Sequence, residues 1–590
     1  MSRPGLHRRR TPVAIAAAAA VGLAAVATAS AANAAPVDLQ NHKKNRISVQ
    51  LLSFNDYHGH IEPDTGPDSE VSHEGKPVVT NGAAFLATHL ANLRKGHDHS
   101  FTVAAGDLIG GSTFTSGVFH DEPSVETLNA MHLDVSGVGN HEFDEGVTEL
   151  LRMQNGGCHP VDGCFQQDAA GNDIRYPGAD FRYLAANVVN TSTGKTVLPR
   201  WSVKRLGGAK IGFIGMTLEG TDSLVAPTGV AGYDFRDEVR AGNRAAKILQ
   251  RKHGVKAIVV LLHEGGFQTG SYSGCTGISG PIVDIAKRLA PKIDAIITGH
   301  THQPYACTLA DPKGQPRKVT SAMSFGRVVT EINLKVNART NDVVRPSVKA
   351  VNHLVTRDVA PSPGVKAIVD KWVAKAAGPG NRVVGSIAQD IRRAFTNNRE
   401  DRGKESSLSN LIADAQKAST GAQVAFMNPG GVRADLLVAN SPAGEPAGQI
   451  TYREAFNVQP FSNILQTFDM TGAQIDQLLE QQWIAGRPGG RDVLRLGISD
   501  GFTYNWSASA AFGNKVDPAS IKINGVVVNP TTAYRVTANN FMADGGDSYS
   551  AFVNGAPRTG GKVDLDALID YMGAHPGLTA PPATRSTQTP

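Results

Sequence analysis

The sequence predicts an α/β fold with two domains, an N-terminal α/β domain and a C-terminal α+β domain. Its 590 residues, of which 41% are hydrophobic, are too many for a single core. Short apolar runs alternate with longer segments of helical character in the first half, which is typical of βα units on a sheet. A helix-like segment followed by β-rich runs comes later. We therefore expect domains over 47–345 and 381–556.

The first 35 residues have the composition of an export signal. Three consecutive arginines precede an Ala/Val-rich run, and the small-residue sequence "ANAA" follows, as in secretory signal peptides. We expect a signal peptide over 1–35, cleaved near Ala34 or Ala35, and a secreted mature protein. The run is short and alanine-rich for a membrane span, so we expect no membrane anchor.

Removal of that segment leaves little net charge. The formal net charge of +5 falls by the four arginines of the segment, which contains no acidic residue, to +1 in the mature chain. Binding a long polyanion requires a sustained basic face, so we expect no binding to long nucleic acid. A monomer and a dimer are both compatible with the sequence.

The cysteines predict two disulfides. The chain has four cysteines, and an even number in an exported protein favours disulfides. None lies in a C-x-x-C pair, which argues against a thiolate zinc site. We expect Cys158 to pair with Cys164 and Cys275 to pair with Cys307.

Two segments are predicted from composition and helix-breaking residues. Residues 364–377 have apolar residues at helical spacing between "APSP" and "GPG", which predicts a linker helix over 360–380. A surface helix of either domain would give the same pattern, whereas a true linker helix would be a hinge candidate.

The Pro/Thr/Ala-rich residues 573–590 predict a disordered tail.

Five apolar runs of the first domain each end on side chains that can bind a metal ion. In chain order these are Asp56 and His58, Asp107, Asn140, His263, and His300 and His302. The carboxyl edge of an α/β sheet is where sites assemble. One histidine after a strand is usually structural, whereas five such endings favour a shared site.

The mixture of ligands predicts two divalent ions. Carboxylate, amide and imidazole ligands suit Zn²⁺, Mn²⁺ or Co²⁺, and the candidates are too many for one tetrahedral ion. Two ions that share a carboxylate, roughly 3.5–4 Å apart as in two-metal hydrolases, accommodate them all. Asp107 is our candidate for the bridging carboxylate.

The order of these motifs resembles a known family. The blocks N-D-x-H, G-D, G-N-H-E, H and G-H-x-H are similar to those of calcineurin-like metallophosphatases. Together with two blocks of the second domain, they make the chain resemble the secreted bacterial 5′-nucleotidase and UDP-sugar hydrolase family. The resemblance implies a four-layer αββα first domain and a substrate-binding second domain.

The resemblance also implies how the ligands divide between the two ions. One ion would lie among Asp56, His58 and Asp107, with His302 as a further candidate ligand. The other would lie among Asp107, Asn140, His263 and His300.

The motif "GNHEFD" supplies a candidate catalytic pair. Asp144 lies one helical turn after His141, where it can orient the imidazole and favour its protonated form. The resemblance implies the same His-Asp pair. A cationic His141 would stabilise charge on phosphoryl oxygens. Taken alone, the motif is also compatible with a helix start capped by Asn140.

The second domain contains residues suited to a nucleotide. Arginines bind phosphate, aromatic rings stack on bases, glycines permit close approach, and a carboxylate accepts from ribose hydroxyls. The candidates are Arg399, Arg402, Asn428, Gly430, Gly431, Arg433, Phe461, Phe541 and Asp547. Taken singly, these residues also have ordinary structural explanations: the arginines as solvated charges, the Asn-Pro-Gly-Gly segment as a turn, and the phenylalanines as core residues. The blocks "NPGGVR" and "FMADGGD" match the family's pocket blocks, so the resemblance implies the same roles.

The resemblance implies a secreted hydrolase that converts nucleoside 5′-monophosphates to nucleosides and phosphate. Alternatives are a 2′,3′-cyclic-nucleotide 2′-phosphodiesterase/3′-nucleotidase or a UDP-sugar diphosphatase. A non-catalytic nucleotide-binding surface protein is a third alternative, although such descendants lose a ligand or the histidine and neither is missing here. A pocket for sugar rather than nucleobase would be favoured if Phe461 and Phe541 were core residues.

Overall fold

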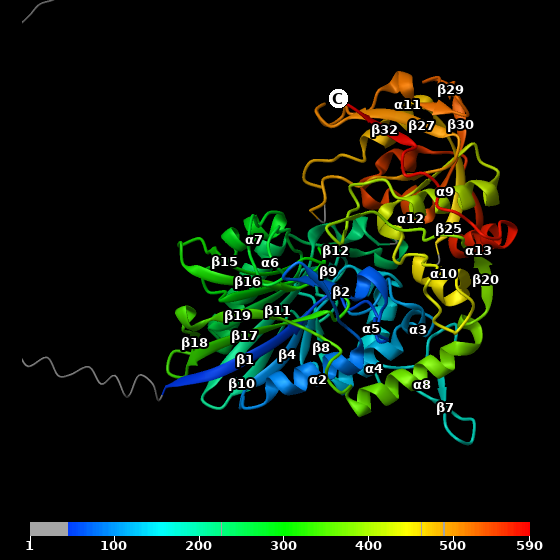
Figure 1. Ribbon diagram of the computed structural model, residues 1–590. Coiled ribbons are helices and arrows are strands. Elements are labelled where there is room, and N and C mark those ends of the chain that lie inside the picture. The colour runs from blue at the N-terminus through cyan, green and yellow to red at the C-terminus, as the bar shows by residue number, and fades with distance from the viewer. Residues whose placement is uncertain (1–44, 226, 462, 488–489) are drawn as a thin grey trace, which may run out of the picture. The chain divides into compact units, whose positions relative to one another are not determined.

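The structure is a computed structural model that describes residues 45–225, 227–461, 463–487 and 490–590 (Figure 1). The predicted signal peptide over 1–35 lies outside these residues. Within the described part of the chain, no helix combines the length and the apolar character needed to cross a membrane.

The first sheet of the N-terminal domain carries three of the five predicted strand endings. Its strands are β1 (Arg46–Phe54), β4 (Ser100–Ala105), β5 (Val135–Gly137), β8 (Arg182–Leu184), β17 (Val328–Asn337), β18 (Asp342–Val343) and β19 (Lys349–Leu354). The order among the described residues is β18-β17-β1-β4-β5-β8, with β19 beside β17. β1, β4, β5 and β8 run parallel, so their carboxyl ends share one edge.

The second sheet of the N-terminal domain carries the other two predicted strand endings. Its strands are β10 (Trp201–Leu206), β11 (Ala209–Thr217), β13 (Ala257–His263), β14 (Ala295–Thr298), β15 (Pro304–Ala310) and β16 (Pro316–Ala322). They are ordered β10-β11-β13-β14-β16-β15, and the central four are parallel.

Hydrophobic packing arranges these sheets and their helices in four layers. Leu51 of the first sheet shares a buried cluster with Phe213 and Leu261 of the second, so the two sheets face each other. The outer face of the first sheet packs on α2 (Ala83–Arg94), α4 (Glu122–Ala130) and α5 (Gly146–Asn155), and that of the second on α6 (Glu238–His253) and α7 (Pro281–Arg288) (Figure 1). The expected αββα arrangement is confirmed.

Local signals set the helix ends, as α6 illustrates. The side chain of Asp237 accepts from the amide of Arg240 at 2.6 Å and caps the first turn. Gly254 ends the helix with φ 66°, a left-handed conformation that glycine adopts without strain. Between these ends, Val239, Ala245 and Leu249 are buried against the sheet.

Helix α8 (Pro363–Gly380) occupies the segment where the sequence predicts a linker helix. Its Trp372 is fully buried and donates through Nε1 to Glu126 of α4 at 2.7 Å. α8 packs against α2 and α4 and therefore lies on the N-terminal domain (Figure 1).

The C-terminal domain combines helices with two mixed sheets, in which β23–β30 and β27–β32 are parallel pairs. One sheet has the order β26-β23-β30-β25-β31 and a smaller one the order β29-β28-β27-β32 among the described residues. The strands of the first are β23 (Val424–Met427), β25 (Ile464–Thr471), β26 (Gly497–Ile498), β30 (Ala533–Asn539) and β31 (Thr559–Val563). Those of the second are β27 (Phe502–Ser507), β28 (Lys522–Ile523), β29 (Val526–Val527) and β32 (Ser586–Thr589). The helices are α9 (Ser407–Thr420), α10 (Tyr452–Val458), α11 (Gly472–Glu480), α12 (Asn540–Ala543) and α13 (Asp564–Ala574).

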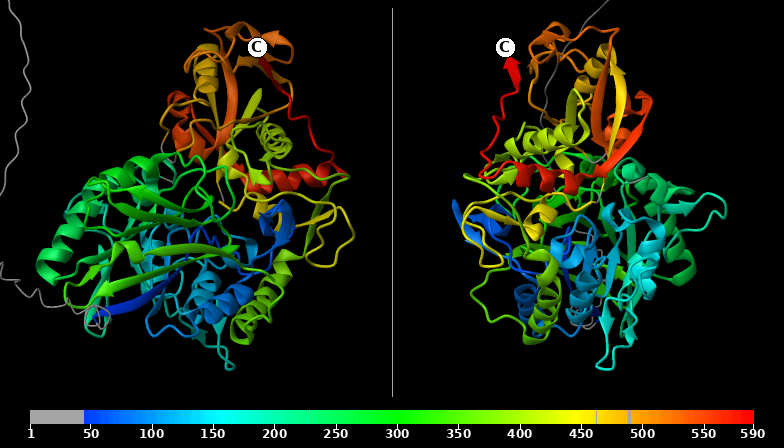
Figure 2. Two further views of the ribbon diagram at one scale, coloured as in Figure 1. Left: turned by 60° about the vertical axis from the view of Figure 1, so that its left-hand side comes forward. Right: turned by 90° about the vertical axis from the view of Figure 1, so that its right-hand side faces the viewer.

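The prediction of a disordered tail over 573–590 is wrong. β32 pairs in parallel with β27, and Arg585 donates to both carboxylate oxygens of Asp414 at 2.7 Å. Figure 2 shows this C-terminal segment running along the domain beyond α13. The segment has few residues that could form a hydrophobic core, which is why its composition predicted disorder. Backbone pairing with the edge of a strand and the ion pair with Asp414 order it instead.

The predicted disulfide pairing is confirmed. One disulfide joins Cys158 to Cys164, and the other joins Cys275 to Cys307.

Candidate active site

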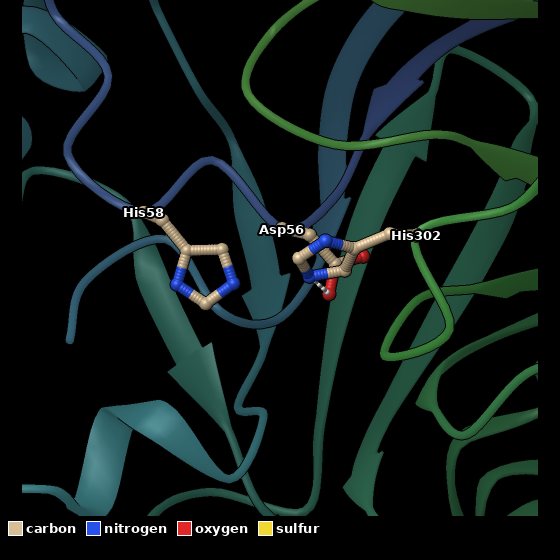
Figure 3. Close-up of side chains that lie close together, drawn as sticks. All are labelled: Asp56, His58 and His302. Atoms are coloured by element: carbon tan, nitrogen blue, oxygen red, sulfur yellow. Dashed lines mark ion pairs between the residues drawn. The ribbon is translucent and has the colours of Figure 1, made fainter. Parts of the chain in front are cut away.

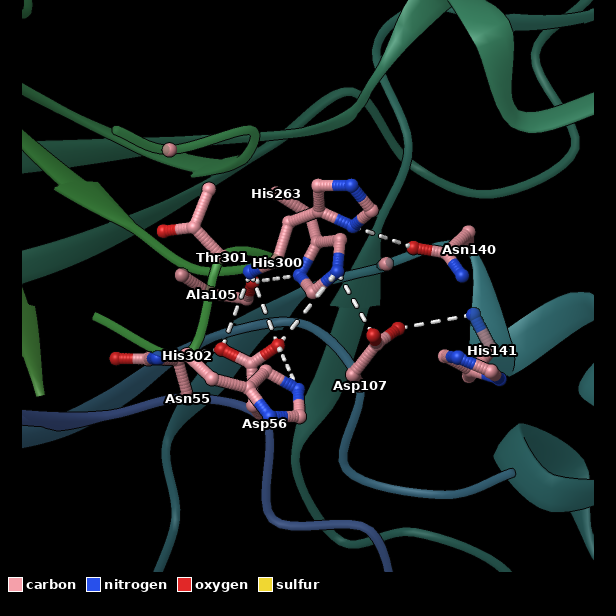
Figure 4. Close-up of polar contacts among 12 residues, drawn as sticks. Asn55, Asp56, Ala105, Asp107, Asn140, His141, His263, His300, Thr301 and His302 are labelled. Atoms are coloured by element: carbon pink, nitrogen blue, oxygen red, sulfur yellow. Dashed lines mark hydrogen bonds and ion pairs between the residues drawn. The ribbon is translucent and has the colours of Figure 1, made fainter. Parts of the chain in front are cut away.

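The seven candidate ligands lie together at the carboxyl ends of strands from both sheets. Asp56 and His58 follow β1, Asp107 follows β4, and Asn140 follows β5. His263 is the last residue of β13, and His300 and His302 follow β14. Figure 3 shows Asp56, His58 and His302 close together, and Figure 4 shows Asp56 and His302 with the other four ligands.

Five of these seven residues have a left-handed backbone. Their φ angles are 50° for Asp56, 48° for His58, 50° for Asp107, 70° for His300 and 55° for His302. Residues other than glycine rarely adopt this conformation, and the strain it carries concentrates at functional sites. The chain after β1, β4 and β14 therefore turns through left-handed residues whose polar side chains belong to the cluster.

One group consists of Asp56, His58 and His302, which point toward one another in Figure 3. His302 Nε2 lies 3.4 Å from Asp56 Oδ1, and His58 Nε2 lies 3.7 Å from Asp107 Oδ2. These separations suit side chains that share an ion rather than a hydrogen bond.

A second group shares Asp107 with the first. His263 Nε2 lies 2.8 Å from Asp107 Oδ2, and His300 Nδ1 lies 3.0 Å from Asn140 Oδ1. Asp107, His263 and His300 offer ligand atoms within 4.8 Å of one another. Asp107 is thus the carboxylate that stands between the two groups, as expected for a bridging ligand.

The hydrogen bonds of the histidines fit bound metal ions. Nδ1 of His58 bonds the carbonyl of Gly110, and Nδ1 of His263 bonds the carbonyl of Ala105, both at 2.7 Å. The Nε2 atoms of His58 and His300 are buried without a hydrogen-bond partner among the described residues, and Nε2 of His263 faces the Asp107 carboxylate. A carbonyl that fixes one ring nitrogen and leaves the other free is the usual surrounding of a metal-binding histidine.

The protonation states of the cluster also favour a bound metal ion. Burial lowers the pKa of His58, His300 and His302 well below the ordinary value, so these imidazoles are neutral and able to bind metal. Burial also raises the pKa of Asp56 to about 7. Burial would raise the pKa of Asp107 too, but His263 and His141 hold it well below its usual range. A cation at this position would compensate the charge of the ionised Asp107 and favour the ionised form of Asp56.

His141 is placed beside the cluster by its own backbone. Its amide donates to Asp107 Oδ1 at 2.8 Å, and its Nδ1 lies 2.8 Å from Asp144 Oδ2. Burial opposes protonation of His141, but Asp144 and Asp107 raise its pKa. The imidazole therefore favours its cationic form and has its second nitrogen free for another partner.

One cavity of about 460 Å³ connects this cluster to the C-terminal domain. The N-terminal domain contributes Asn140, His141, Asp144 and His300. The predicted residues of the C-terminal domain that line it are Arg402, Asn428, Gly430, Gly431, Arg433, Phe461, Phe541 and Asp547. Its volume lies in the range typical of small-molecule sites.

The two phenylalanines line the cavity and are not core residues. Phe461 and Phe541 are each only half-buried. The ring of Phe461 is stacked at 5.8 Å from that of His141. Phe541 lies over Gly546, where a Cβ atom would come within 2.5 Å of the ring. Only glycine leaves room for the ring in that position.

Two family models match this chain. Calcineurin-like phosphoesterase matches residues 51–304, and 5′-nucleotidase, C-terminal domain matches residues 383–554. Cell wall protein Lmo0130 of Listeria monocytogenes is 32% identical over 557 residues, which cover 89% of this chain and 67% of that protein. The chain belongs to the 5′-nucleotidase family.

A further relative and a solved structure extend the comparison. Endonuclease YhcR of Bacillus subtilis is 32% identical over 538 residues, which cover 90% of this chain but only 40% of that protein. The chain thus spans less than half the length of that relative. The structure of a 5′-nucleotidase precursor from Thermus thermophilus has the same fold, with a TM-score of 0.73 at 23% identity over 92% of this chain and 99% of that one.

Arg399 does not line this cavity, which differs from our expectation for it. It donates to Gln303 Oε1 at 2.8 Å and to the carbonyl of Gln268 at 3.0 Å, in the N-terminal domain. The spacing of Arg399 and Arg402 suggests a pair, but the short strand β22 (Arg399–Glu400) and the turn after it direct the two side chains to different partners. Only Arg402 faces the cavity.

Arg491 is a cavity residue that was not expected from the sequence. It lines the cavity, and neither Arg491 nor Arg433 has an ion-pair partner among the described residues. Burial, followed by the charge of Arg402, lowers the pKa of both to about 10, so each remains charged. The segment "GRPGGR" has the same glycine-then-arginine pattern as "NPGGVR" and could have indicated it.

Proposed function

We propose that this chain is a secreted, metal-dependent hydrolase of nucleoside 5′-monophosphates, which it converts to nucleosides and inorganic phosphate. The observation that carries the proposal is one shared cavity. It is bordered by two of the candidate metal ligands, Asn140 and His300, by His141, and by the arginine and phenylalanine residues of the C-terminal domain. The family supports phosphoester hydrolysis in general. The choice of nucleoside monophosphates rests on the cavity.

Two divalent ions would be held by the strand-end cluster. Asp56, His58 and His302 would hold one, Asn140, His263 and His300 would hold the other, and Asp107 would contact both. Zn²⁺, Mn²⁺ and Co²⁺ all suit these ligands. When bound, such ions act as Lewis acids on a phosphoryl oxygen and make water a nucleophile at neutral pH.

The arginines of the cavity would bind the phosphate end of the substrate. Arg402 is held by Glu400, with Nε 3.0 Å from Oε1, which leaves its two terminal nitrogens free. Arg433 has no competing ion pair among the described residues. Guanidinium groups in this state form charge-assisted, bidentate bonds to phosphate.

The nucleoside end would be bound by the phenylalanines and Asp547. A planar base stacked between the half-buried rings of Phe461 and Phe541 would gain roughly 1–3 kcal/mol. Asp547 Oδ2 accepts from Asn428 Nδ2 at 2.8 Å, so its other oxygen is available to ribose hydroxyls. This arrangement favours a nucleotide over a simple sugar phosphate.

His141 would stabilise the charge that develops during phosphoryl transfer. The Asp144 carboxylate holds one ring nitrogen at 2.8 Å and favours the imidazolium. The free nitrogen could then donate to a phosphoryl oxygen or give its proton to the departing nucleoside oxygen.

Export of the protein is supported by its two disulfides, which persist in oxidising compartments. The relative Lmo0130 bears the name of a cell wall protein. Edman sequencing of the protein from culture medium tests this, with an N-terminus close to Ala35 expected. Retention of the full-length chain inside the cell would contradict export.

A substrate panel tests the proposed activity. The purified protein is assayed with AMP, UDP-glucose and 2′,3′-cyclic AMP, in EDTA and with Mn²⁺ or Zn²⁺, and all products are separated by chromatography. We expect metal-dependent conversion of AMP to adenosine and phosphate. Preference for UDP-glucose or the cyclic nucleotide would favour the corresponding alternative. Binding of AMP without conversion by any metal-loaded sample would favour a binding protein.

A further inference from the structure

A second cluster of histidine and acidic side chains lies on the N-terminal domain, apart from the strand-end ligands. His120 lies between α3 (Phe114–Gly117) and α4, Glu145 is the residue before α5, and His159 and Asp162 belong to the loop that follows α5 (Figure 1). The proposed activity uses none of them.

The four side chains are in direct contact. His120 Nδ1 lies 2.6 Å from Glu145 Oε2, and His120 Nε2 lies 2.7 Å from Asp162 Oδ2. The rings of His120 and His159 are stacked, with centroids 3.8 Å apart. His120, Glu145 and His159 each offer a ligand atom within 4.8 Å of the others. That is the spacing at which one ion can contact all three.

The loop that carries His159 and Asp162 is held in place by covalent and backbone bonds. The Cys158–Cys164 disulfide closes it. Inside the disulfide, His159 and Gly163 exchange two backbone hydrogen bonds at 2.9 and 3.0 Å. His159 therefore lies on a short, closed loop that holds it beside His120.

The chemistry of the cluster resembles that of the strand-end site. Asp162 binds one ring nitrogen of His120, which leaves the other directed at Glu145, and a carboxylate behind a histidine is a common support for a metal ligand. Two imidazoles and one carboxylate suit Zn²⁺ and similar ions. His120 also has a left-handed backbone, with φ 48°, as do five of the strand-end ligands.

The cluster borders the substrate cavity and is open to solvent. His120 and Glu145 line the cavity together with Asp144. The side chains of Glu145 and Asp162 are 44% and 52% exposed, so an ion could enter without unfolding. A cation here would add positive charge to the cavity wall next to the His141–Asp144 pair.

We propose that His120, Glu145 and His159 form a third divalent-cation site, suited to zinc-like ions, with Asp162 orienting His120. Occupancy of this site requires neither the two-ion centre nor the proposed activity.

Zinc stoichiometry tests this proposal directly. Purified wild-type protein is dialysed against buffered Zn²⁺ and its bound zinc is measured by elemental analysis and native mass spectrometry. We expect His159→Ala and Glu145→Gln each to bind one Zn²⁺ fewer per chain than the wild type. His253→Ala, which removes an exposed histidine at the end of α6, is the control and should bind as much as the wild type.

A second background separates this site from the two-ion centre. In His58→Ala/His263→Ala protein, we expect one Zn²⁺ per chain to remain and to raise Tm. Adding His159→Ala should abolish both effects, and Asp162→Asn should weaken the remaining site by about 10–100-fold. Equal zinc binding by the wild type and the His159→Ala and Glu145→Gln variants, whatever the state of the two-ion centre, would overturn the proposal.

Discussion

The Nδ1 atom of His141 lies 2.8 Å from Asp144 Oδ2, and the two residues are separated by one turn of chain. This contact fixes the orientation of the imidazole and raises the pKa of His141 against the effect of burial. Both side chains border the cavity and neither belongs to the candidate ligand set.

Asp144→Asn should lower kcat for AMP by about 100-fold, the typical cost of removing one preorganised electrostatic group. Because the substitution lowers the pKa of His141, the loss of activity at high pH should begin at a lower pH than in the wild type. The pH profile of kcat measures both effects. An unchanged profile with unchanged metal content would show that Asp144 does not act through His141.

Removal of metal should destabilise the protein. Ions present at 100 times their Kd stabilise the folded state by about 2.7 kcal/mol each, and their loss leaves buried carboxylates without a cation. EDTA should therefore lower Tm, and His58→Ala should reduce this effect because Nε2 of His58 is a free ligand atom. A Tm that stays constant when elemental analysis shows complete loss of metal would contradict the two-ion centre.

Arg491→Ala should raise KM for AMP by about 10-fold or more, since hydrogen bonds to charged groups contribute about 1.5–3 kcal/mol. Arg399→Ala is the matched control because Arg399 bonds Gln303 and Gln268 outside the cavity. Steady-state kinetics of the two variants should differ in KM more than in kcat. Equal KM values for Arg491→Ala and the wild type would remove Arg491 from the binding site.

Gly546→Ala should weaken recognition of the base by displacing the Phe541 ring, which a Cβ atom would approach to 2.5 Å. We expect kcat/KM for AMP to fall by up to about 100-fold, the equivalent of 1–3 kcal/mol of stacking. Ribose 5-phosphate, which has no base, should be hydrolysed at the wild-type rate. Gly560→Ala, where a Cβ atom meets nothing within 4 Å, is the control. A parallel fall for both substrates would contradict stacking by Phe541.

Arg585→Ala should destabilise the C-terminal domain by about 3–5 kcal/mol, the usual cost of leaving one partner of a buried ion pair alone. Arg585 and Asp414 have side chains only 8% and 11% exposed. Arg558→Ala breaks a more exposed pair with Asp544 and should cost less. Urea unfolding measures the free energy of unfolding of both variants. Equal stability of the two variants would mean that the C-terminal segment contributes little.

The sequence predicted the strand-end ligands because each follows an apolar run, and parallel strands place their carboxyl ends at one edge. The disulfide pairing also followed from the sequence. Arg399 was expected at the cavity and Arg491 was missed, because side-chain direction in a loop depends on tertiary partners that spacing does not encode. The tail was misjudged because composition does not report backbone pairing such as that of β32 with β27.

The most direct test of the account is phosphate release from AMP by one preparation of the protein, measured after metal removal and again after Mn²⁺ or Zn²⁺ is restored. We predict no release from the metal-free protein, and adenosine plus phosphate in equal amounts once metal is restored. Release that survives complete metal removal, or no release from folded protein that has rebound its metal, would contradict a two-metal nucleotidase.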